Sequence, residues 1–289
     1  MPQNSNEIMS MRKIIFLFLT ILLFSACAAP AANVSATSTT IPSLEAPTAT
    51  VTPLPTETPI PPTPTTTYIE KVCSPLDGIE LNELTGIITQ PYKTPHPKND
   101  DGHHGVDFAF YRFKDLVGIE GIPITASLAG EVVTVLVDKN PYGYAVIIET
   151  PLNNLNPDLL AKLKLPEIQP TVVSDPRVNC PSNGELGFTL SESDRSLYLL
   201  YGHMKEMPLV KVGDIITCGQ QLGYVGNSGQ SSNAHLHFEA RVGPSGARFE
   251  SMAYYTVQST EAERYNYCVW RVSNRFELLD PMILLSVQN

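Results

Sequence analysis

A stretch of forty residues rich in proline and threonine constrains this chain most, because it cannot contribute to a folded core. Residues 28–67 contain nine prolines and twelve threonines, and Glu45 and Glu57 are their only charged residues. Such a segment has too little hydrophobic surface to offset the entropy lost on ordering. We therefore predict a disordered Pro/Thr linker over residues 28–67, followed by one folded domain over residues 68–289.

The residues before the linker have the layout of an export signal. Arg12 and Lys13 precede the apolar residues 14–24, and a short run of small residues ends at Cys27. A helix over that apolar run is about 17 Å long, well short of the roughly 30 Å hydrocarbon layer, so no permanent membrane span is expected. The ending Leu-Phe-Ser-Ala-Cys resembles the lipobox of bacterial lipoproteins, which implies a lipoprotein-type signal peptide over residues 1–27 and lipidation of Cys27. An ordinary cleaved signal peptide is the alternative.

Signal and linker together predict an exported lipoprotein of the cell envelope, anchored in the membrane through Cys27 and facing the cell wall or the outside. An extended linker of this length reaches on the order of 120 Å, although a passive spacer fits the same composition. The net charge is −10, and no run of Lys or Arg follows the linker. This disfavours nucleic-acid binding, which depends on neutralising phosphates. We expect a monomer.

The cysteines agree with export. Four of them remain in the domain, and no Cys-x-x-Cys pair occurs, which argues against a cysteine zinc site. In an oxidising compartment an even number predicts two disulfides, with three possible pairings. Because the ends of a domain often lie close together, we expect Cys73–Cys268 together with Cys180–Cys218.

The domain reads as short strands separated by Gly, Asn or Pro turns. Runs rich in Val, Ile, Leu and Tyr cover residues 122–126, 131–137, 144–150, 197–201, 214–217, 221–225 and 235–241. We therefore predict a mostly β fold, a compact antiparallel sheet similar to a barrel-sandwich. A 45-residue irregular insertion, residues 151–195, interrupts it and contains one short helix over residues 158–164. Residues 276–285 are expected to close the domain.

His235 and His237 form a candidate metal-binding pair. Side chains two residues apart on a strand project from the same face, so both imidazoles address one volume while Leu236 and Phe238 point into the core. Neutral imidazole suits zinc, although a partly exposed strand can carry two histidines without any metal.

The segment around His103 strengthens the metal hypothesis. A catalytic zinc ion takes three protein ligands and keeps one position open for water. His103 and Asp107 offer an imidazole and a carboxylate, and Gly105 permits a tight turn between them. The spacing alone does not distinguish His103 from His104, and a polar surface loop has a similar composition.

Three ordered motifs resemble those of the lysostaphin-type (LytM-like) zinc metalloendopeptidases. The motifs are His103-His-Gly-Val-Asp107, Tyr201-Gly-His203 and Ala234-His-Leu-His-Phe-Glu239. Residues 122–137 and 211–226 are also similar to strand segments of that family. The resemblance implies a β metallopeptidase domain that hydrolyses peptide cross-links of peptidoglycan, with one Zn²⁺ per chain.

The same resemblance assigns roles to five residues. It implies that His103, Asp107 and His237 hold the zinc ion, and that His203 and His235 are the catalytic groups. No Glu stands as in His-Glu-x-x-His enzymes, so these two histidines must accept the proton of water and stabilise the oxyanion, in an order that the sequence leaves open.

Several features leave alternatives open. Asp100 and Asp101 stand where relatives often have a basic or amide residue, and the insertion could wall, narrow or block the groove. The loop containing Ser231, Ser232 and Asn233 is expected to form one groove wall, or else is an ordinary strand connector. A non-catalytic wall-binding or regulatory module on the same fold is the alternative function.

Overall fold

The structure, a computed structural model, describes residues 68–96, 100–166, 178–181 and 184–287. All of them belong to one unit that spans Pro62–Asn289. The predicted signal peptide, the predicted linker and Cys27 lie outside the described residues. Within the described residues, none of the helices has the length and hydrophobicity needed to cross a membrane.

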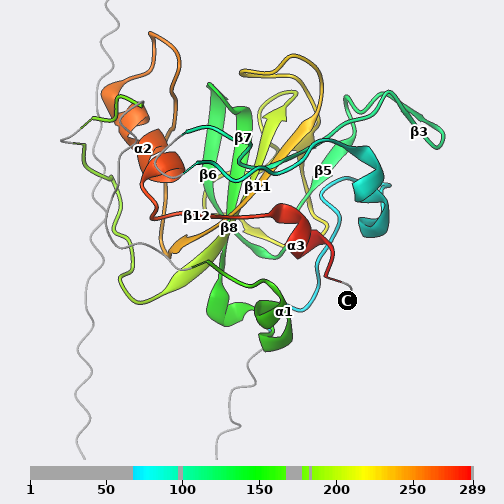
Figure 1. Cartoon of the computed structure of the whole chain (residues 1–289), viewed down its shortest axis with the longest axis horizontal. Helices are drawn as coiled ribbons and strands as arrows, with labels where there is room; N and C mark the ends of the chain where they lie inside the picture. Colours follow the sequence, from blue (N-terminus) through cyan, green and yellow to red (C-terminus); the bar gives the residue numbers. More distant parts are fainter. Residues whose placement is uncertain (1–67, 97–99, 167–177, 182–183, 288–289) are drawn as a thin grey trace, which may run out of the picture. The chain divides into compact units, whose positions relative to one another are not determined.

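A central antiparallel sheet organises the domain (Figure 1). Within the described residues its strand order is β1-β2-β11-β8-β7-β6-β9, and β12 also pairs with β11. The strands are β1 (Ile88–Gln90), β2 (Val106–Phe108), β6 (Gly130–Lys139), β7 (Gly143–Pro151), β8 (Arg195–Met204), β9 (Ile215–Ile216), β11 (Leu236–Pro244) and β12 (Glu277–Leu279). The mostly β antiparallel prediction is confirmed, and the sheet of the described part stays open rather than closing into a barrel.

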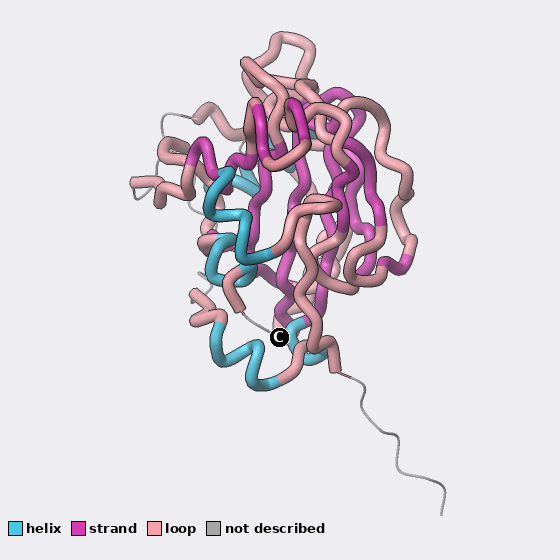
Figure 2. The backbone as a smooth tube through the Cα atoms, turned by 90° about the vertical axis from the view of Figure 1, so that its right-hand side faces the viewer, coloured by secondary structure: helices cyan, strands magenta, loops and turns pink. Residues whose placement is uncertain are grey.

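Smaller elements surround this sheet. Strands β5 (Pro123–Thr125) and β10 (Gln221–Tyr224) form one pair, and β3 (Arg112–Phe113) and β4 (Leu116–Val117) form another. The helical segments are η1 (Leu81–Ile87), η2 (Leu152–Asn154), α1 (Pro157–Lys162), α2 (Glu261–Val272) and α3 (Pro281–Leu285). Figure 2 shows the strands in the middle of the domain and helical segments along its edge.

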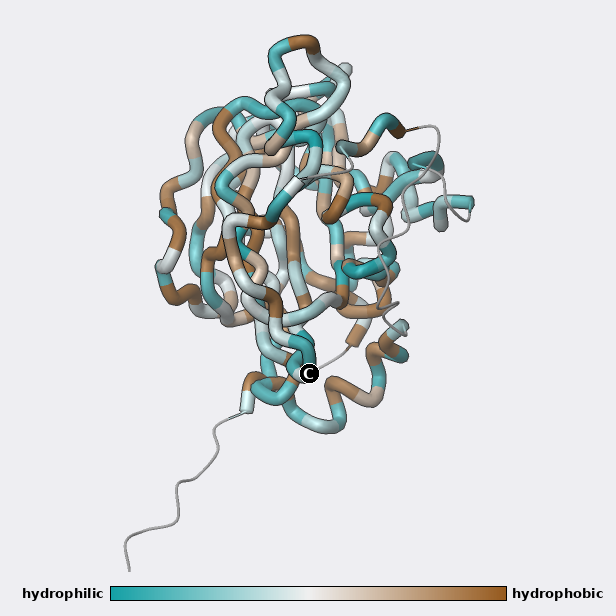
Figure 3. Tube along the Cα trace, turned by 90° about the vertical axis from the view of Figure 1, so that its left-hand side faces the viewer, coloured by the Kyte–Doolittle hydropathy of each residue, from teal (hydrophilic) through white to brown (hydrophobic). Residues whose placement is uncertain are grey.

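The long central strands bury both faces, because alternate residues enter two different hydrophobic clusters. On β7 and β8, Val146, Ile148 and Leu199 pack in one cluster, while Ile147 and Leu200 pack in the other. This alternation is the two-residue period of a strand that carries hydrophobic side chains on both faces. Figure 3 shows hydrophobic segments recurring along the chain through the body of the domain.

Helix α2 covers the second face of the sheet and was not predicted from the sequence. Trp270 is 1% exposed and packs with Tyr198, Phe249 and Phe276 from the sheet side. A capping box at Thr260 fixes the helix start. This helix brings side chains to the site described below.

The first part of the insertion packs on the first cluster. The predicted helix over residues 158–164 is found as α1, shifted by one or two residues. Leu155, Leu159 and Leu163 are buried in the first cluster, so this part of the insertion is anchored to the sheet. Residues 167–177 and 182–183 of the insertion lie outside the described residues.

Both disulfides form, but the expected pairing is wrong. The structure pairs Cys73 with Cys218 and Cys180 with Cys268. Cys73 donates its N–H to Ser127 O beside the turn that holds Cys218, so the start of the domain lies against that turn. Cys268 sits within α2 rather than near the chain end, and α2 packs against the insertion that carries Cys180.

Candidate metal centre and active site

Two neighbouring strands place Asp107 and His237 directly opposite each other. Asp107 lies in β2 and His237 in β11, and the antiparallel register pairs their Cα atoms. Side chains of such a pair share a face of the sheet and are in contact. Gly105 makes the approach possible, since a Cβ at this position would come within 2.4 Å of Phe238 O.

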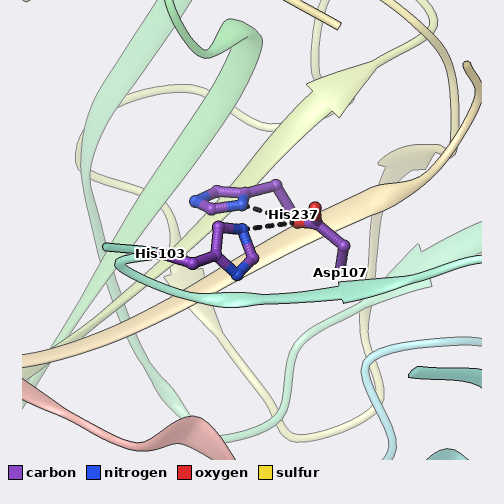
Figure 4. A group of neighbouring side chains, drawn as sticks. All are labelled: His103, Asp107 and His237. Atoms are coloured by element: carbon purple, nitrogen blue, oxygen red, sulfur yellow. Dashed lines mark hydrogen bonds and ion pairs between the residues drawn. The ribbon is translucent and has the colours of Figure 1, made fainter. Parts of the chain in front are cut away.

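His103 completes a group of three potential metal ligands. It lies just before β2, where a bridge to Lys93 holds its backbone. His103 Nε2 is 3.1 Å from Asp107 Oδ1, and His237 Nδ1 is 2.8 Å from the same oxygen. Figure 4 shows both rings converging on the carboxylate of Asp107.

The group fits a metal ion in both its spacing and its outer hydrogen bonds. The three ligand atoms lie within 4.8 Å of one another. Ligand atoms around a tetrahedral zinc ion with bonds of about 2.1 Å lie about 3.4 Å apart. The ring nitrogens that face away are also held, His103 Nδ1 by Pro91 O at 3.0 Å and His237 Nε2 by Glu239 Oε1 at 3.1 Å. Metal-binding histidines usually have such a partner, which fixes the tautomer.

The electrostatics of the group favour a charged carboxylate. Burial opposes ionisation of Asp107, but hydrogen bonds from His103 and His237 hold its pKa well below the usual range. Burial likewise opposes protonation of His237, yet its bonds to Asp107 and Glu239 raise its pKa to about 9. Without a metal, a proton on Nδ1 of His237 therefore takes the place that a cation would occupy.

His203 and His235 form a second pair beside this group. Their ring centroids are 4.6 Å apart, and that of His203 is 5.7 Å from the His237 ring. His203 has a φ of 57° at the end of β8, where the β7–β8 register shifts opposite it. An irregularity of this kind re-aims a side chain at the edge of a regular ladder.

The backbone fixes the tautomers of both histidines. Nδ1 of His203 is 2.8 Å from Ser228 O, and Nδ1 of His235 is 2.8 Å from Asn233 O. A carbonyl oxygen only accepts, so Nδ1 carries the hydrogen and the neutral rings keep Nε2 as an acceptor. Burial, followed by the nearby His237 and His235, lowers the pKa of His203 to about 3.

A cavity of about 530 Å³ opens over both pairs of rings. Ser231, Ser232 and Asn233, expected at a groove wall, do lie on its wall. Ser231 Oγ is also 3.2 Å from His235 Nδ1. Among the described residues of the insertion, none lines this cavity, so the described part does not block it.

The family comparison supports the motifs. Residues 181–249 match the model of peptidase family M23. This segment is similar to peptidase family M23. The matched segment includes His203, His235 and His237, whereas His103 and Asp107 lie outside it and reach the site through β2.

Solved structures similar to this chain include three peptidases. The catalytic domain of the prophage-encoded M23 protein EnpA from Enterococcus faecalis is 22% identical, with a TM-score of 0.31. The match covers 55% of this chain and 82% of the EnpA chain. The lysostaphin catalytic domain from Staphylococcus simulans is 18% identical, with a TM-score of 0.35, and the match covers 72% of this chain and 98% of the lysostaphin domain. A zinc-containing peptidase from Vibrio cholerae is 24% identical, with a TM-score of 0.31, and the match covers 56% of this chain and 35% of that peptidase. The comparison with curated proteins gave no match.

The structure distinguishes the two adjacent histidines, His103 and His104. His103, not His104, belongs to the metal-ligand group. His104 is 1% exposed, and its Nδ1 is 2.7 Å from Arg241 Nη2. Burial and the charges of Arg271 and Arg241 lower the pKa of His104 to about 2, so this ring stays neutral.

Sequence reasoning missed the wall of the cavity that comes from α2 and the residues before it. Tyr255, Tyr267 and Arg271 line the cavity, together with Tyr142 from the turn between β6 and β7. The only sequence signal for α2 was its capping box followed by a helical run. Nothing in that signal indicates which side chains reach the site.

The acidic residues before His103 have different partners. Asp100 accepts hydrogen bonds from Arg271, Tyr255 and Tyr267. Burial would raise its pKa, but the Arg271 charge and these bonds lower it to about 2. Asp101 contacts His96 at 2.9 Å. The negative charge of Asp100 is therefore balanced by Arg271.

Proposed function

We propose that this chain is a cell-envelope zinc endopeptidase that hydrolyses peptide cross-links or bridges of peptidoglycan. The observation that carries the proposal is the convergence of His103, Asp107 and His237 within a cavity that also receives His203 and His235. The M23 match supports a metallopeptidase of the type that hydrolyses peptidoglycan. We propose that the enzyme is a monomer and binds one Zn²⁺.

The donor set suits a Lewis-acidic metal. Two neutral imidazoles and one carboxylate leave a divalent ion with a net charge of about +1. A zinc ion held there by His103, Asp107 and His237 would polarise the scissile carbonyl and would lower the pKa of water toward about 7.

The two remaining histidines supply the proton transfers. His203, neutral over the range in which most enzymes work, offers Nε2 as the acceptor for the proton of the attacking water. His235 has its Nδ1–H fixed on Asn233 O, so when it is protonated its Nε2–H is the donor for the oxyanion. The hydroxyls of the loop at Ser231 and Ser232 line the path of the peptide.

The decisive experiment separates metal binding from catalysis. We would purify the full chain, measure its zinc content and follow peptide release from purified cell walls. His203→Ala should keep the zinc and lower the turnover by about 10²–10⁴-fold, because a positioned proton acceptor contributes that much. His96→Ala is the matched control, since this exposed imidazole contacts Asp101 and does not line the cavity that holds His203.

Full zinc loading without hydrolysis of any wall preparation would contradict the enzyme proposal. That result would instead favour the alternative, a non-catalytic wall-binding or regulatory module on the same fold.

We also propose that the protein is exported and held in the membrane through a lipid on Cys27. The basic residues, short apolar run and Cys27 support this proposal. Cys27→Ser should move the protein from the membrane fraction to the soluble fraction and abolish labelling by a fatty acid. If Cys27→Ser stays in the membrane fraction although it no longer takes up the fatty acid, the anchor proposal is wrong.

A further inference from the structure

A partly buried arginine, Arg271, joins the two chain segments that carry the candidate metal ligands. Arg271 Nε donates to Asp100 Oδ1 at 2.8 Å, and its Nη1 lies 3.3 Å from Glu239 Oε1. Asp100 stands three residues before His103, and Glu239 stands two residues after His237. Arg271 therefore contacts both segments just outside the ligand group.

The contacts lie where charge is costly to leave unpaired. Glu239 is fully buried, the side chain of Asp100 is 3% exposed and that of Arg271 is 14% exposed. Two carboxylates so deeply buried need cations close by. Arg241 supplies one, through Nε to Glu239 Oε2 at 2.9 Å, and Arg271 supplies the other. Removal of Arg271 would leave two buried negative charges beside one positive charge.

Glu239 links Arg271 to the metal site, because its carboxylate contacts both Arg271 and His237. Its Oε1 accepts from Tyr142 OH at 2.9 Å, and Nη1 of Arg271 donates to the same hydroxyl at 3.2 Å. The same oxygen holds His237 Nε2 at 3.1 Å, which turns Nδ1 toward Asp107. A carboxylate behind a metal-binding histidine orients the ring and raises its basicity.

Helix α2 holds Arg271 firmly enough for this role. The disulfide between Cys180 and Cys268 lies one turn before Arg271, and Trp270 beside it is buried in the core. The guanidinium also lies 5.7 Å from the ring of Tyr267 on the same helix. The arginine is thus presented by a rigid element and not by a loop.

We propose that Arg271 is a positioning residue for the metal centre, holding the His103 segment and the His237 strand at the spacing that zinc requires. The inference rests on the zinc site of the proposed function. It assigns a task to an element, α2, that lies outside the three sequence motifs.

The test measures metal affinity rather than hydrolysis. The full chain, stripped of metal, is titrated with Zn²⁺ against a chromophoric chelator, and Co²⁺ is added to record the visible spectrum of the site. Arg271→Met, which keeps the length of the side chain without its charge, should weaken Zn²⁺ binding by about 10–100-fold, as loss of an outer partner does. It should also change the Co²⁺ spectrum. Arg271→Lys, which keeps the charge but not the planar fork, should fall between Arg271→Met and the wild type.

Arg264→Met is the matched control. Arg264 lies on the same helix and donates to Ser259 O, away from both ligand segments. Its Zn²⁺ affinity and Co²⁺ spectrum should match those of the wild type.

Zn²⁺ binding by Arg271→Met within twofold of the wild type would overturn the inference. If that variant does not fold, as judged by circular dichroism, Asp100→Asn tests the same link, and unchanged affinity there overturns it equally. The proposed function fails separately, because a wild-type chain that binds zinc without cutting cell walls leaves the role of Arg271 intact.

Discussion

The two halves of the candidate site are held in place by different forces. Asp107, His203 and His237 stand on strands whose backbone ladders fix them relative to one another. Tyr267 and Arg271 stand on α2, which a buried tryptophan and the ion pair between Arg271 and Glu239 attach to the same sheet and a disulfide attaches to the insertion. The groups assigned to chemistry therefore lie on the half fixed by hydrogen-bonded strands, while those that orient and line the site lie on the half fixed by side chains.

Removal of a strand-borne ligand should have the largest effect. Asp107→Ala removes the oxygen that contacts both His103 and His237, so zinc content should fall to near zero and peptide release to background. Zinc analysis and the cell-wall assay measure both. Retention of stoichiometric zinc by Asp107→Ala would show that the metal, if bound, lies elsewhere.

The strand-borne half should also show a marked pH dependence. In the metal-free chain the pKa of His237 is raised to about 9, so its proton stabilises the fold fully below about pH 6.5, and that stabilisation is lost as the pH rises through 9. Zinc must displace this proton, so the zinc affinity should rise by up to about tenfold per pH unit between pH 7 and 9. Calorimetry in buffers of different ionisation enthalpy should detect close to one proton released per zinc at pH 7. No release would mean that His237 is already neutral.

The two disulfides test the helix-borne half against a control within the same chain. Loss of Cys180–Cys268, by Ser at both positions, should weaken zinc binding by several fold, because α2 loses a fixed point beside Arg271. Loss of Cys73–Cys218, which closes a longer loop with a separation of 145 residues, should lower the stability by about 2–5 kcal/mol and leave zinc affinity unchanged. Urea denaturation and chelator competition measure the two quantities. Equal effects on zinc affinity would contradict the division between the halves.

The smallest effect is expected at the groove loop. Ser231→Ala removes one contact to Nδ1 of His235, whose other partner, Asn233 O, remains. Turnover should fall by only a few fold, since a neutral hydrogen bond contributes about 1 kcal/mol. Steady-state kinetics on a soluble peptide substrate measure it, with Ser232→Ala as the neighbouring control. A loss comparable to that of His203→Ala would place this hydroxyl among the catalytic groups.

Local patterns in the sequence were enough for the sheet. The strands predicted over residues 131–137, 144–150, 197–201 and 235–241 are found as parts of β6, β7, β8 and β11. Their β-branched and aromatic runs are long and bounded by turn residues, so local preference and burial agree. The five motif residues also meet in one place, because β11, with its two-residue period, pairs with β2 on one side and with β8 on the other.

The contacts that surround the site and the disulfide pairing depend instead on residues far apart in the sequence. The bond between Arg271 and Asp100 joins positions 171 residues apart, and that between Arg241 and His104 joins positions 137 apart. No local spacing indicates such partners. The disulfide pairing was wrong for the same reason, since closeness of the chain ends says nothing about which turn lies beside Cys73.

The first described residues are attached to the rest of the domain at two points, and these attachments affect how the domain responds to force. Ile69 is bridged to Leu155, and Cys73 is covalently joined to Cys218. A pull arriving through the preceding chain would open the Ile69 bridge and then stop at the sulfur–sulfur bond. Strands β2 and β8 lie inside the closed loop, so tension on that end would not be passed along them. The candidate site would therefore keep its geometry while the domain is pulled from that end.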